Sequence, residues 1–324
     1  MKAILCKSFA PVSELVYEEV DTPSAGKGEV LIDVVAAGVN FPDSLLVQGL
    51  YQMKPELPFI PGTEVSGTIS QVGEGVSNLT VGMKVIAMCQ LGGYAQKVAV
   101  PYMQVMPIPD AIPLQEASGL LTAHATAHHA LKQRAHLQSG ETLLVTGAAG
   151  GTGLAAVQIG KTMGATVIAV CSSDEKCKVA KQNGADITIN HSQQDLKETV
   201  KALTKGKGVD VVYECVGGDT FHACTRVMAW SGRLLVIGFA GGDIPKFPVN
   251  LALVKGFSVV GVFWGSFTQH QPQDFMMNMK ELVTWYTQGK VKVVVDEAFS
   301  LANAVDAINK VTSRLVKGKV ILLP

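Results

Sequence analysis

The sequence lacks a surplus of either charge and lacks any long apolar run. Lysine plus arginine and aspartate plus glutamate number 27 each, so the overall charge does not favour binding to nucleic acid or to an anionic membrane. The apolar run near Met1 is too short for a signal sequence, and no later run approaches the length of a membrane span. We therefore expect a soluble, cytoplasmic protein with no nucleic-acid or membrane partner.

Cysteines are few and widely spaced, and no two of them form a C-x-x-C pair. This spacing argues against a disulfide framework and against a structural zinc site. We expect the cysteines to be reduced and mostly buried as small hydrophobic side chains. They are Cys6, Cys89, Cys171, Cys177, Cys215 and Cys224.

The chain is long enough for two domains, with 324 residues of which 48% are hydrophobic. Residues 1–117 hold short β-type runs separated by glycine and proline, which predicts a mostly β, partly barrel-shaped domain. Residues 118–258 alternate strand-like and helix-like runs, as a doubly wound parallel sheet requires. Residues 259–324 hold too few elements for a domain, so we expect them to return to the first one. The predicted fold class is α/β, with the parallel sheet inserted into the β domain.

A glycine-rich segment joins a strand-like run to a helix-like run at residues 142–153. Glycine permits a tight turn and a close approach of the backbone to a pyrophosphate, and the N–H groups that begin the helix attract phosphate. The spacing G-x-x-G-x-x-G departs from the stricter G-x-G-x-x-G, so a glycine-rich loop without a ligand is the alternative. The alternating strands and helices that follow favour a dinucleotide-binding loop. Its predicted contact residues are Gly147, Ala149, Gly150, Gly151, Thr152 and Gly153.

The residues after the second strand-like run indicate which cofactor binds. An NAD-binding unit carries an acidic side chain here, which accepts hydrogen bonds from the ribose hydroxyls. This chain instead places two hydroxyls and a cation there, Ser172, Ser173 and Lys176, which suit the 2′-phosphate of NADPH. Asp174 lies one residue late, in the first turn of a helix, where the helix dipole accounts for it. We therefore expect NADPH, with NAD as the alternative.

Seven motifs spread along the chain carry a family resemblance: AAGVNFPD, PGTEVSG, GVSNLTVGMKV, GGYAQKVAVP, GAAGGTG, CSSDEK and GFSVVGVFWG. Together they resemble the medium-chain dehydrogenase/reductase superfamily, and within it the zinc-independent quinone oxidoreductase-like branch. The resemblance covers essentially the entire chain. It implies a GroES-like catalytic domain formed by residues 1–117 and 259–324, and an NADP-binding Rossmann domain formed by residues 118–258.

The chain departs from the zinc-dependent relatives at the residues that hold their metal. Where those enzymes resemble G-V-C-x-x-D, Asn40 replaces the cysteine, and where they carry G-H-E, Thr63 replaces the histidine. Their four-cysteine lobe is missing as well. We therefore expect no metal and no zinc-dependent alcohol dehydrogenation.

Three neighbouring histidines raise the question of a different metal site. His124 and His128 are four residues apart and could share one face of a helix, with His129 beside them. A metal site would need a further ligand and an open position, which the sequence does not reveal. We prefer the interpretation that one helix near the cofactor simply contains three histidines.

The resemblance also implies contacts with the cofactor outside the glycine-rich loop. Asn190 and His191 match positions near the adenosine. Core or subunit packing is the alternative for Phe263 and Trp264, and residues 259–262 could pair as an edge strand between the subunits of a homodimer, an assembly common in the branch. The positions that match contacts with the nicotinamide are Thr126, Phe239, Ala240, Phe263 and Trp264.

Two polar residues in the first domain are candidates for catalysis. Without a metal the substrate must already be electron-poor, such as a quinone or an alkene conjugated to a carbonyl, and its developing charge needs hydrogen bonds and a proton. Asn40 could donate a hydrogen bond to the substrate or to the nicotinamide ribose, with a structural turn role as the alternative. Tyr51 matches a tyrosine that is thought to donate the proton in related 2-enoyl thioester reductases, with packing as the alternative.

Three functions are compatible with these residues. The first is an NADPH-dependent reductase of quinones or enones. The second is a 2-enoyl thioester reductase that acts on an acyl-CoA or an acyl carrier. The third, of another class, is a non-catalytic NADPH-binding structural or RNA-binding protein, which the balanced net charge disfavours.

Overall fold

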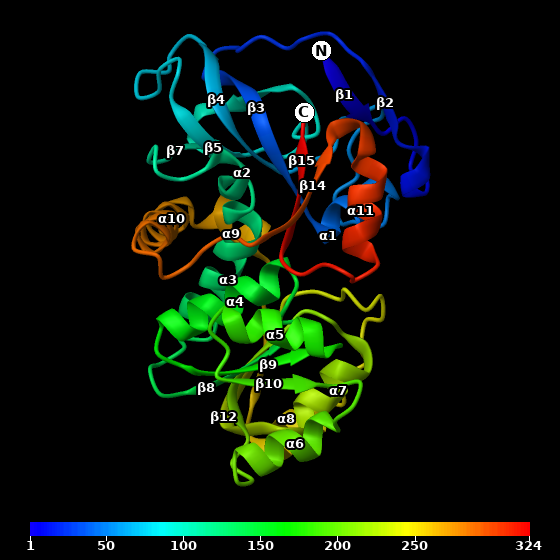
Figure 1. Ribbon diagram of the computed structural model, residues 1–324, viewed down its shortest axis with the longest axis vertical. Coiled ribbons are helices and arrows are strands. Elements are labelled where there is room, and N and C mark those ends of the chain that lie inside the picture. Colours follow the sequence, from blue (N-terminus) through cyan, green and yellow to red (C-terminus); the bar gives the residue numbers. More distant parts are fainter. The chain divides into compact units, whose positions relative to one another are not determined.

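The computed structural model describes residues 1–324, and the chain divides into two compact units. Unit 1 contains Met1–Thr122 and Val293–Pro324, and unit 2 contains Ala123–Lys292 (Figure 1). The division differs from the expected one, because residues 259–292 stay with unit 2 instead of returning to the first domain. The reason is packing: β13 (Ser258–Gly261) pairs with β12 (Met228–Val236), and α10 (Pro272–Thr287) packs on α3 (Thr126–His129).

Unit 1 is built on a seven-stranded sheet in the order β14-β15-β3-β4-β5-β7, with β6 also paired to β3. Its end strands β14 and β7 do not pair, so the barrel is not closed. The pairing of β3 with β4 shifts register at two bulges, which bend the sheet. The strands of unit 1 are β1 (Lys2–Leu5), β2 (Val16–Glu19), β3 (Glu29–Val39), β4 (Glu64–Val72), β5 (Lys84–Met88), β6 (Lys97–Pro101), β7 (Val105–Pro107), β14 (Val295–Ser300) and β15 (Lys319–Leu323).

Short helices cover the sheet of unit 1. α11 buries Ala304, Ala307 and Ile308, which recur at the spacing of one helical face, and packs them on β14 and β15. α1 begins directly after β3 and contacts α11. The helices are α1 (Phe41–Val47), α2 (Leu114–Ala117) and α11 (Ala304–Thr312), with short 3-10 turns at Val12–Glu14, Tyr102–Gln104 and Leu301–Asn303.

Unit 2 is a doubly wound parallel sheet in the order β10-β9-β8-β11-β12-β13. The chain runs from β8 outward to β10, then crosses back to β11 and proceeds to the other edge, so the order reverses between β8 and β11. Ligands of such sheets bind beyond the carboxyl ends of the strands at this reversal. The strands are β8 (Thr142–Thr146), β9 (Thr166–Cys171), β10 (Ile187–Asn190), β11 (Val209–Glu214), β12 and β13.

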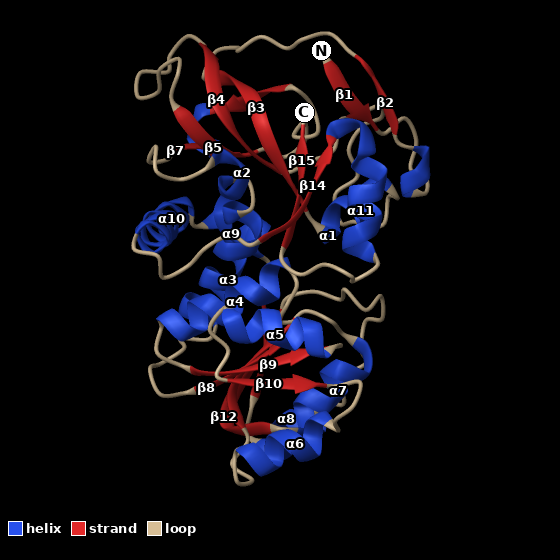
Figure 2. Cartoon of the chain, in the orientation of Figure 1, coloured by secondary structure: helices blue, strands red, loops and turns tan.

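Helices lie on both faces of the unit 2 sheet (Figure 2). β8, β9 and β11 are almost entirely buried and mostly apolar, as expected for a sheet covered on both faces. No helix of residues 1–324 is both long enough and apolar enough to span a membrane. The helices are α3, α4 (Gly151–Thr162), α5 (Asp174–Gln182), α6 (Leu196–Leu203), α7 (Gly218–Arg226), α8 (Asn250–Lys255), α9 (Trp264–His270) and α10, with π-helical turns at Leu120–Ala125 and Ala130–Arg134 before and after α3.

Candidate functional site

The glycine-rich loop of unit 2 connects the end of β8 to the beginning of α4, as predicted. Gly147 has a φ of +57°, a conformation that favours glycine, and its carbonyl accepts a hydrogen bond of 2.9 Å from the Gly150 N–H. A Cβ on Gly153 would lie 2.2 Å from the Gly147 oxygen, so only glycine lets α4 begin this close to the loop. The loop therefore presents backbone N–H groups and the positive end of a twelve-residue helix, which suit a phosphate.

Two side chains of the loop, those of Ala149 and Thr152, point into the protein. The Thr152 hydroxyl lies 2.5 Å from the Tyr213 hydroxyl on β11, and Ala149 is buried. The contacts that these two residues could offer a phosphate therefore come from their backbone. Gly150 has open space around its Cα, since the nearest atom to a Cβ there would be the Gly147 oxygen at 3.4 Å.

Ser172 and Lys176 lie together just beyond β9. The Lys176 ammonium is 3.4 Å from the Ser172 hydroxyl. Ser173 has a different task, because its hydroxyl accepts a hydrogen bond of 3.3 Å from the Lys176 backbone N–H and caps α5. A hydroxyl and a cation thus lie at the end of β9, the second strand of the unit 2 sheet along the chain. Dinucleotide-binding folds contact the ribose of the cofactor at this position.

The acidic residue beside them is held by two amides. Asp174 accepts hydrogen bonds from Asn190 Nδ2 at 2.7 Å and from Gln193 Nε2 at 3.3 Å. His191 follows β10 and donates its backbone N–H to Cys171 at 3.0 Å, so it lies beside the end of β9. The structure therefore brings Asn190 and His191 to the same edge as the predicted serines.

A buried carboxylate, Glu214, holds the loops together at the carboxyl edge of the unit 2 sheet. It was not among the predicted residues. Its Oε1 accepts from the backbone N–H groups of Val216 and Gly217 at 2.9 and 3.0 Å and from the Thr146 hydroxyl at 3.2 Å. Burial raises the pKa of Glu214 although these hydrogen bonds oppose the rise. The carboxylate links the end of β8 to the loop after β11. Its signal in the sequence is an acid that ends the apolar run VDVVYE.

Phe239 and Ala240 lie in the loop after β12. The Ala240 N–H donates to Cys215 O at 3.0 Å, so this loop is tied to the one after β11. The predicted residues Phe239 and Ala240 are thus at the carboxyl edge of the sheet with the glycine-rich loop. Thr126 is only partly buried and begins α3, which packs on α4.

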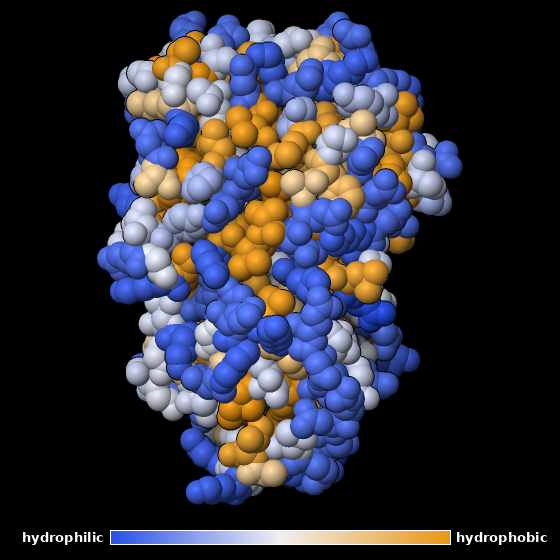
Figure 3. All heavy atoms as spheres, viewed as in Figure 1, coloured by the Kyte–Doolittle hydropathy of each residue, from blue (hydrophilic) through white to orange (hydrophobic).

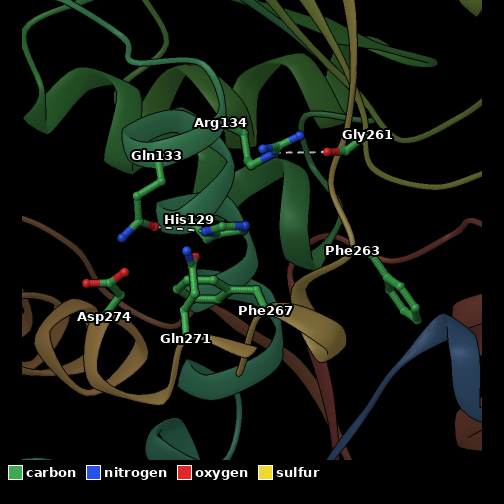
Figure 4. Close-up of a pocket in the computed structure, with 8 residues that line it drawn as sticks. All are labelled: His129, Gln133, Arg134, Gly261, Phe263, Phe267, Gln271 and Asp274. Carbon is green, nitrogen blue, oxygen red and sulfur yellow. Dashed lines mark hydrogen bonds between the residues drawn. The ribbon is translucent and has the colours of Figure 1, made fainter. Parts of the chain in front are cut away.

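Phe263 and Trp264 follow β13 but have different environments. Trp264 is 9% exposed and its ring packs edge-on against Phe275, with ring centres 5.8 Å apart. This contact matches the packing alternative for Trp264. Phe263 is 57% exposed and lines a pocket of about 440 Å³, and its ring points away from the other lining side chains (Figure 4). The pocket is lined by His129, Gln133, Arg134, Gly261, Phe263, Phe267, Gln271 and Asp274.

The three histidines have three separate partners. His124 Nε2 lies 3.2 Å from Lys292 O, and His128 Nε2 lies 2.7 Å from Glu281 Oε2. His129 stacks on Phe267 with ring centres 3.8 Å apart, and burial lowers its pKa. Nowhere in residues 1–324 do three or more His, Cys, Asp or Glu side chains gather in a way that could hold a metal ion.

In unit 1, Asn40 lies in a buried polar cluster between β3 and α1. Its Oδ1 accepts a hydrogen bond of 2.6 Å from the Lys319 ammonium, and its Nδ2 donates one of 2.8 Å to Glu64 Oε1. Lys319 and Glu64 form an ion pair of 2.6 Å, and their side chains are 5% and 0% exposed. Thr63, which precedes Glu64, has no place in this cluster. Lys319 was not among the predicted residues.

Tyr51 lies near a second buried carboxylate, Asp43. Asp43 Oδ2 accepts hydrogen bonds from the Asn40 backbone N–H at 2.8 Å and the Tyr94 hydroxyl at 2.7 Å, while Oδ1 is buried without a partner. Burial raises the pKa of Asp43 to about 6. Tyr51 is partly buried against the core of unit 1, and its pKa is raised by burial and by the Asp43 charge. Tyr51 therefore keeps its proton at neutral pH.

Two family models match the chain. One, described as an alcohol dehydrogenase GroES-like domain, matches residues 26–110, and the other, described as a zinc-binding dehydrogenase, matches residues 151–284. Among curated proteins, quinone oxidoreductase-like protein 2 of Bos taurus is 39% identical over 99% of this chain and 92% of its own length. The quinone oxidoreductase of Pseudomonas aeruginosa is 31% identical over 100% of this chain and 99% of its own.

Solved structures give the same result. The Escherichia coli quinone oxidoreductase in complex with NADPH has a TM-score of 0.93 and 27% identity, with 100% of both chains covered. A mycobacterial protein in complex with NADPH has a TM-score of 0.93 and 32% identity, again with 100% of both chains covered. The family and the fold class predicted from the sequence are therefore confirmed. The chain belongs to the quinone oxidoreductase family of the medium-chain dehydrogenase/reductase superfamily.

Proposed function

We propose that this chain is an NADPH-dependent oxidoreductase that reduces a quinone or a carbonyl-conjugated alkene without zinc. The choice of NADPH as the cofactor rests on the distance of 3.4 Å between Lys176 Nζ and Ser172 Oγ at the end of β9. An ammonium and a hydroxyl there complement a 2′-phosphate, and Asp174, the acid that could read a ribose hydroxyl, is bound to Asn190 and Gln193. The two solved relatives that contain NADPH support the same choice.

The proposed cofactor site extends over the carboxyl edge of the unit 2 sheet. The loop between β8 and α4 holds the pyrophosphate through its N–H groups, and Ser172 and Lys176 hold the 2′-phosphate. His191 borders the adenosine, and Thr126 and Phe239 border the nicotinamide. The full proposed set is Thr126, Gly147, Ala149, Gly150, Gly151, Thr152, Gly153, Ser172, Ser173, Lys176, His191, Phe239, Ala240, Phe263 and Trp264.

The reaction requires the protein to polarise the acceptor molecule and to supply it with a proton. Bound NADPH supplies a hydride, so the acceptor must gain one proton as well. Tyr51 is the proposed proton donor, because a phenol hydroxyl carries a proton at neutral pH and this one is only partly buried in unit 1. Asn40 is the proposed hydrogen-bond donor, because one N–H of its Nδ2 makes only a long contact of 3.4 Å with Gly38 O and is available to an acceptor.

Independence from zinc is supported by the side chains at the positions of the lost ligands. Asn40 offers an amide and Thr63 a hydroxyl where zinc-dependent relatives offer a thiolate and an imidazole. In addition, the ammonium of Lys319 touches Asn40, and a cation opposes binding of a metal ion beside it.

A screen of electron acceptors tests the proposal. Purified protein is mixed with NADPH or NADH and with 1,2-naphthoquinone, a short enone or crotonyl-CoA, and oxidation is followed at 340 nm. Oxidation of NADPH by the quinone or the enone is expected. A preference for crotonyl-CoA would instead establish the 2-enoyl thioester reductase, and a salt-dependent complex with single-stranded RNA without any oxidation would establish the non-catalytic alternative.

We also propose that the protein forms a homodimer. β13 is an end strand of the unit 2 sheet, and Val259 on it is 38% exposed. Trp230 and Leu253 in the same unit are 77% and 82% exposed, and Figure 3 shows apolar side chains at the surface in the region of β12 and α8. An unpaired strand with apolar neighbours is suited to pairing with a second copy. Sedimentation of the wild type and of Val259→Lys tests this, because the variant is expected to sediment as a monomer.

A cytoplasmic location stays a prediction.

A further inference from the structure

The ammonium of Lys319 is enclosed by acceptors and almost removed from solvent. Lys319 begins β15 and is 4% exposed. Its Nζ contacts Glu64 Oε1 at 2.6 Å, Asn40 Oδ1 at 2.6 Å and Val39 O at 3.2 Å. An ammonium has three N–H donors, so each of them has a partner.

The surrounding backbone leaves room for this ion pair at two glycines. A Cβ on Gly38 would lie 2.3 Å from Glu64 Oε1 and 2.5 Å from Ser118 O. A Cβ on Gly119 would lie 2.8 Å from Cγ of Lys319. Glycine at both positions lets the carboxylate and the lysine stem reach the interior together. The ion pair is therefore a built feature of unit 1.

A buried ion pair adds little stability over apolar side chains of the same volume, because removing two charges from water costs as much as their attraction returns. The geometry of the pair gives it another role. An amide oxygen has to face the ammonium and an amide nitrogen has to face the carboxylate, so Lys319 and Glu64 together fix which end of Asn40 points where. In this orientation Nδ2 has one N–H bound to Glu64 and one in the long contact with Gly38 O.

We propose that Lys319 is a positioning residue that orients the Asn40 amide for hydrogen bonding to the acceptor molecule. The inference rests on the proposed function, in which the Asn40 N–H polarises the substrate. Lys319 touches neither substrate nor cofactor in this role, and it acts by occupying Asn40 Oδ1. Without the ion pair of Lys319 and Glu64 the amide can turn over, and an oxygen then replaces the donor.

The test uses the paired substitutions Lys319→Met and Glu64→Gln in one protein. Lys319→Met alone would leave the Glu64 carboxylate buried without its cation and could prevent folding. The paired variant removes both charges, and its new side-chain amide at position 64 can donate to Asn40 Oδ1 and so favours the reversed orientation. Lys310→Met is the matched control, because Lys310 is a partly buried lysine of unit 1 that pairs with Asp296 at 3.1 Å instead of with Glu64 or Asn40.

The first measurement is kcat/KM for the acceptor, in the wild type and in Asn40→Ala backgrounds. Misplacing a group that binds the reacting centre costs of the order of 10²-fold, so the paired variant should lose about that much, with NADPH affinity unchanged. In the Asn40→Ala background the same pair should cause almost no further loss, since the effect passes through Asn40. Losses that multiply in the two backgrounds, or a paired variant as active as Lys310→Met, would overturn the proposal.

The second measurement needs no turnover and decides the inference even if the proposed reaction is wrong. In protein labelled with ¹⁵N-asparagine, the Asn40 side-chain signals are those missing from Asn40→Ala. They should be resolved in the wild type and in Lys310→Met, and should move or broaden in the paired variant. Asn40 signals that stay in place would show that Lys319 does not orient the amide.

Discussion

The Tyr94 hydroxyl donates a hydrogen bond of 2.7 Å to Asp43 Oδ2, and both side chains are fully buried. The same carboxylate oxygen caps α1 by accepting the Asn40 backbone N–H. One oxygen of Asp43 therefore ties the beginning of α1 to the segment between β5 and β6, while the other oxygen has no partner. Burial of this half-satisfied carboxylate raises its pKa to about 6.

Asp43 should make stability depend on pH in the acidic range. Between about pH 4 and pH 6 the folded protein keeps a proton that the unfolded chain releases, so the contribution of Asp43 to the free energy of unfolding falls as pH rises, by up to about 1.4 kcal/mol for each pH unit. Asp43→Asn removes this titration. Urea unfolding at several pH values should show wild type losing stability relative to Asp43→Asn from pH 4 to pH 6, and Asp21→Asn, which replaces an exposed carboxylate, serves as the control. A relative gain across this range would contradict the assignment.

Tyr51→Phe should lower turnover and leave cofactor binding intact. General acid catalysis contributes about 10² to 10⁴-fold, so loss of the hydroxyl should lower kcat on an enone or enoyl thioester by at least about 10-fold. NADPH affinity, measured by quenching of protein fluorescence, should not change. Tyr102→Phe is the control, since Tyr102 also packs partly buried on the core of unit 1. Unchanged turnover would remove Tyr51 from the mechanism.

Lys176→Ala should weaken NADPH selectively. A hydrogen bond to a charged group contributes about 1.5 to 3 kcal/mol, so KM for NADPH should rise about 10-fold or more. KM for NADH should hardly change, because NADH has no 2′-phosphate. Lys178→Ala removes a neighbouring exposed cation from the same helix and serves as the control. Equal rises for both cofactors would place Lys176 outside the 2′-phosphate site.

Gly153→Ala and Gly150→Ala should differ although both lie in one loop. The added Cβ at 153 would meet the Gly147 backbone oxygen at 2.2 Å, whereas at 150 the distance is 3.4 Å. Overpacking costs about 1 to 3 kcal/mol, so Gly153→Ala should lower the free energy of unfolding by about that amount and Gly150→Ala should leave it nearly unchanged. Urea unfolding measures both. Similar losses for the two variants would mean that α4 shifts easily.

The sequence was sufficient where the partners are close along the chain. Ser172 and Lys176 are four residues apart at a strand-to-helix junction, so their approach follows from local geometry. The alternating pattern of residues 118–258 likewise predicts the parallel strands and crossover helices of unit 2. The apolar pattern is less informative before β14, because Val291 and Val293 are buried outside the sheet and the strand begins only at Val295.

Contacts set by distant parts of the chain could not be predicted in this way. Asn40 and Lys319 are 279 residues apart, and they meet because Val39 of β3 pairs with Val320 of β15. The one local sign was a lysine that opens the apolar strand KVILL. The assignment of α9 and α10 to unit 2 similarly depends on contacts such as His129 with Phe267, which no pattern within the helices reveals.

Unit 1 is assembled from two segments that flank the whole of unit 2, which has a consequence for the order of folding during synthesis. β3 and its neighbours leave the ribosome first, but β15 follows only after Ala123–Lys292 has been made. The nascent chain can thus complete the cofactor-binding half while the other half still has an unpaired edge on β3 and an Asn40 without its ammonium. Unit 1 is therefore begun first and completed last. Until β15 has been made, the exposed edge of β3 needs protection from aggregation.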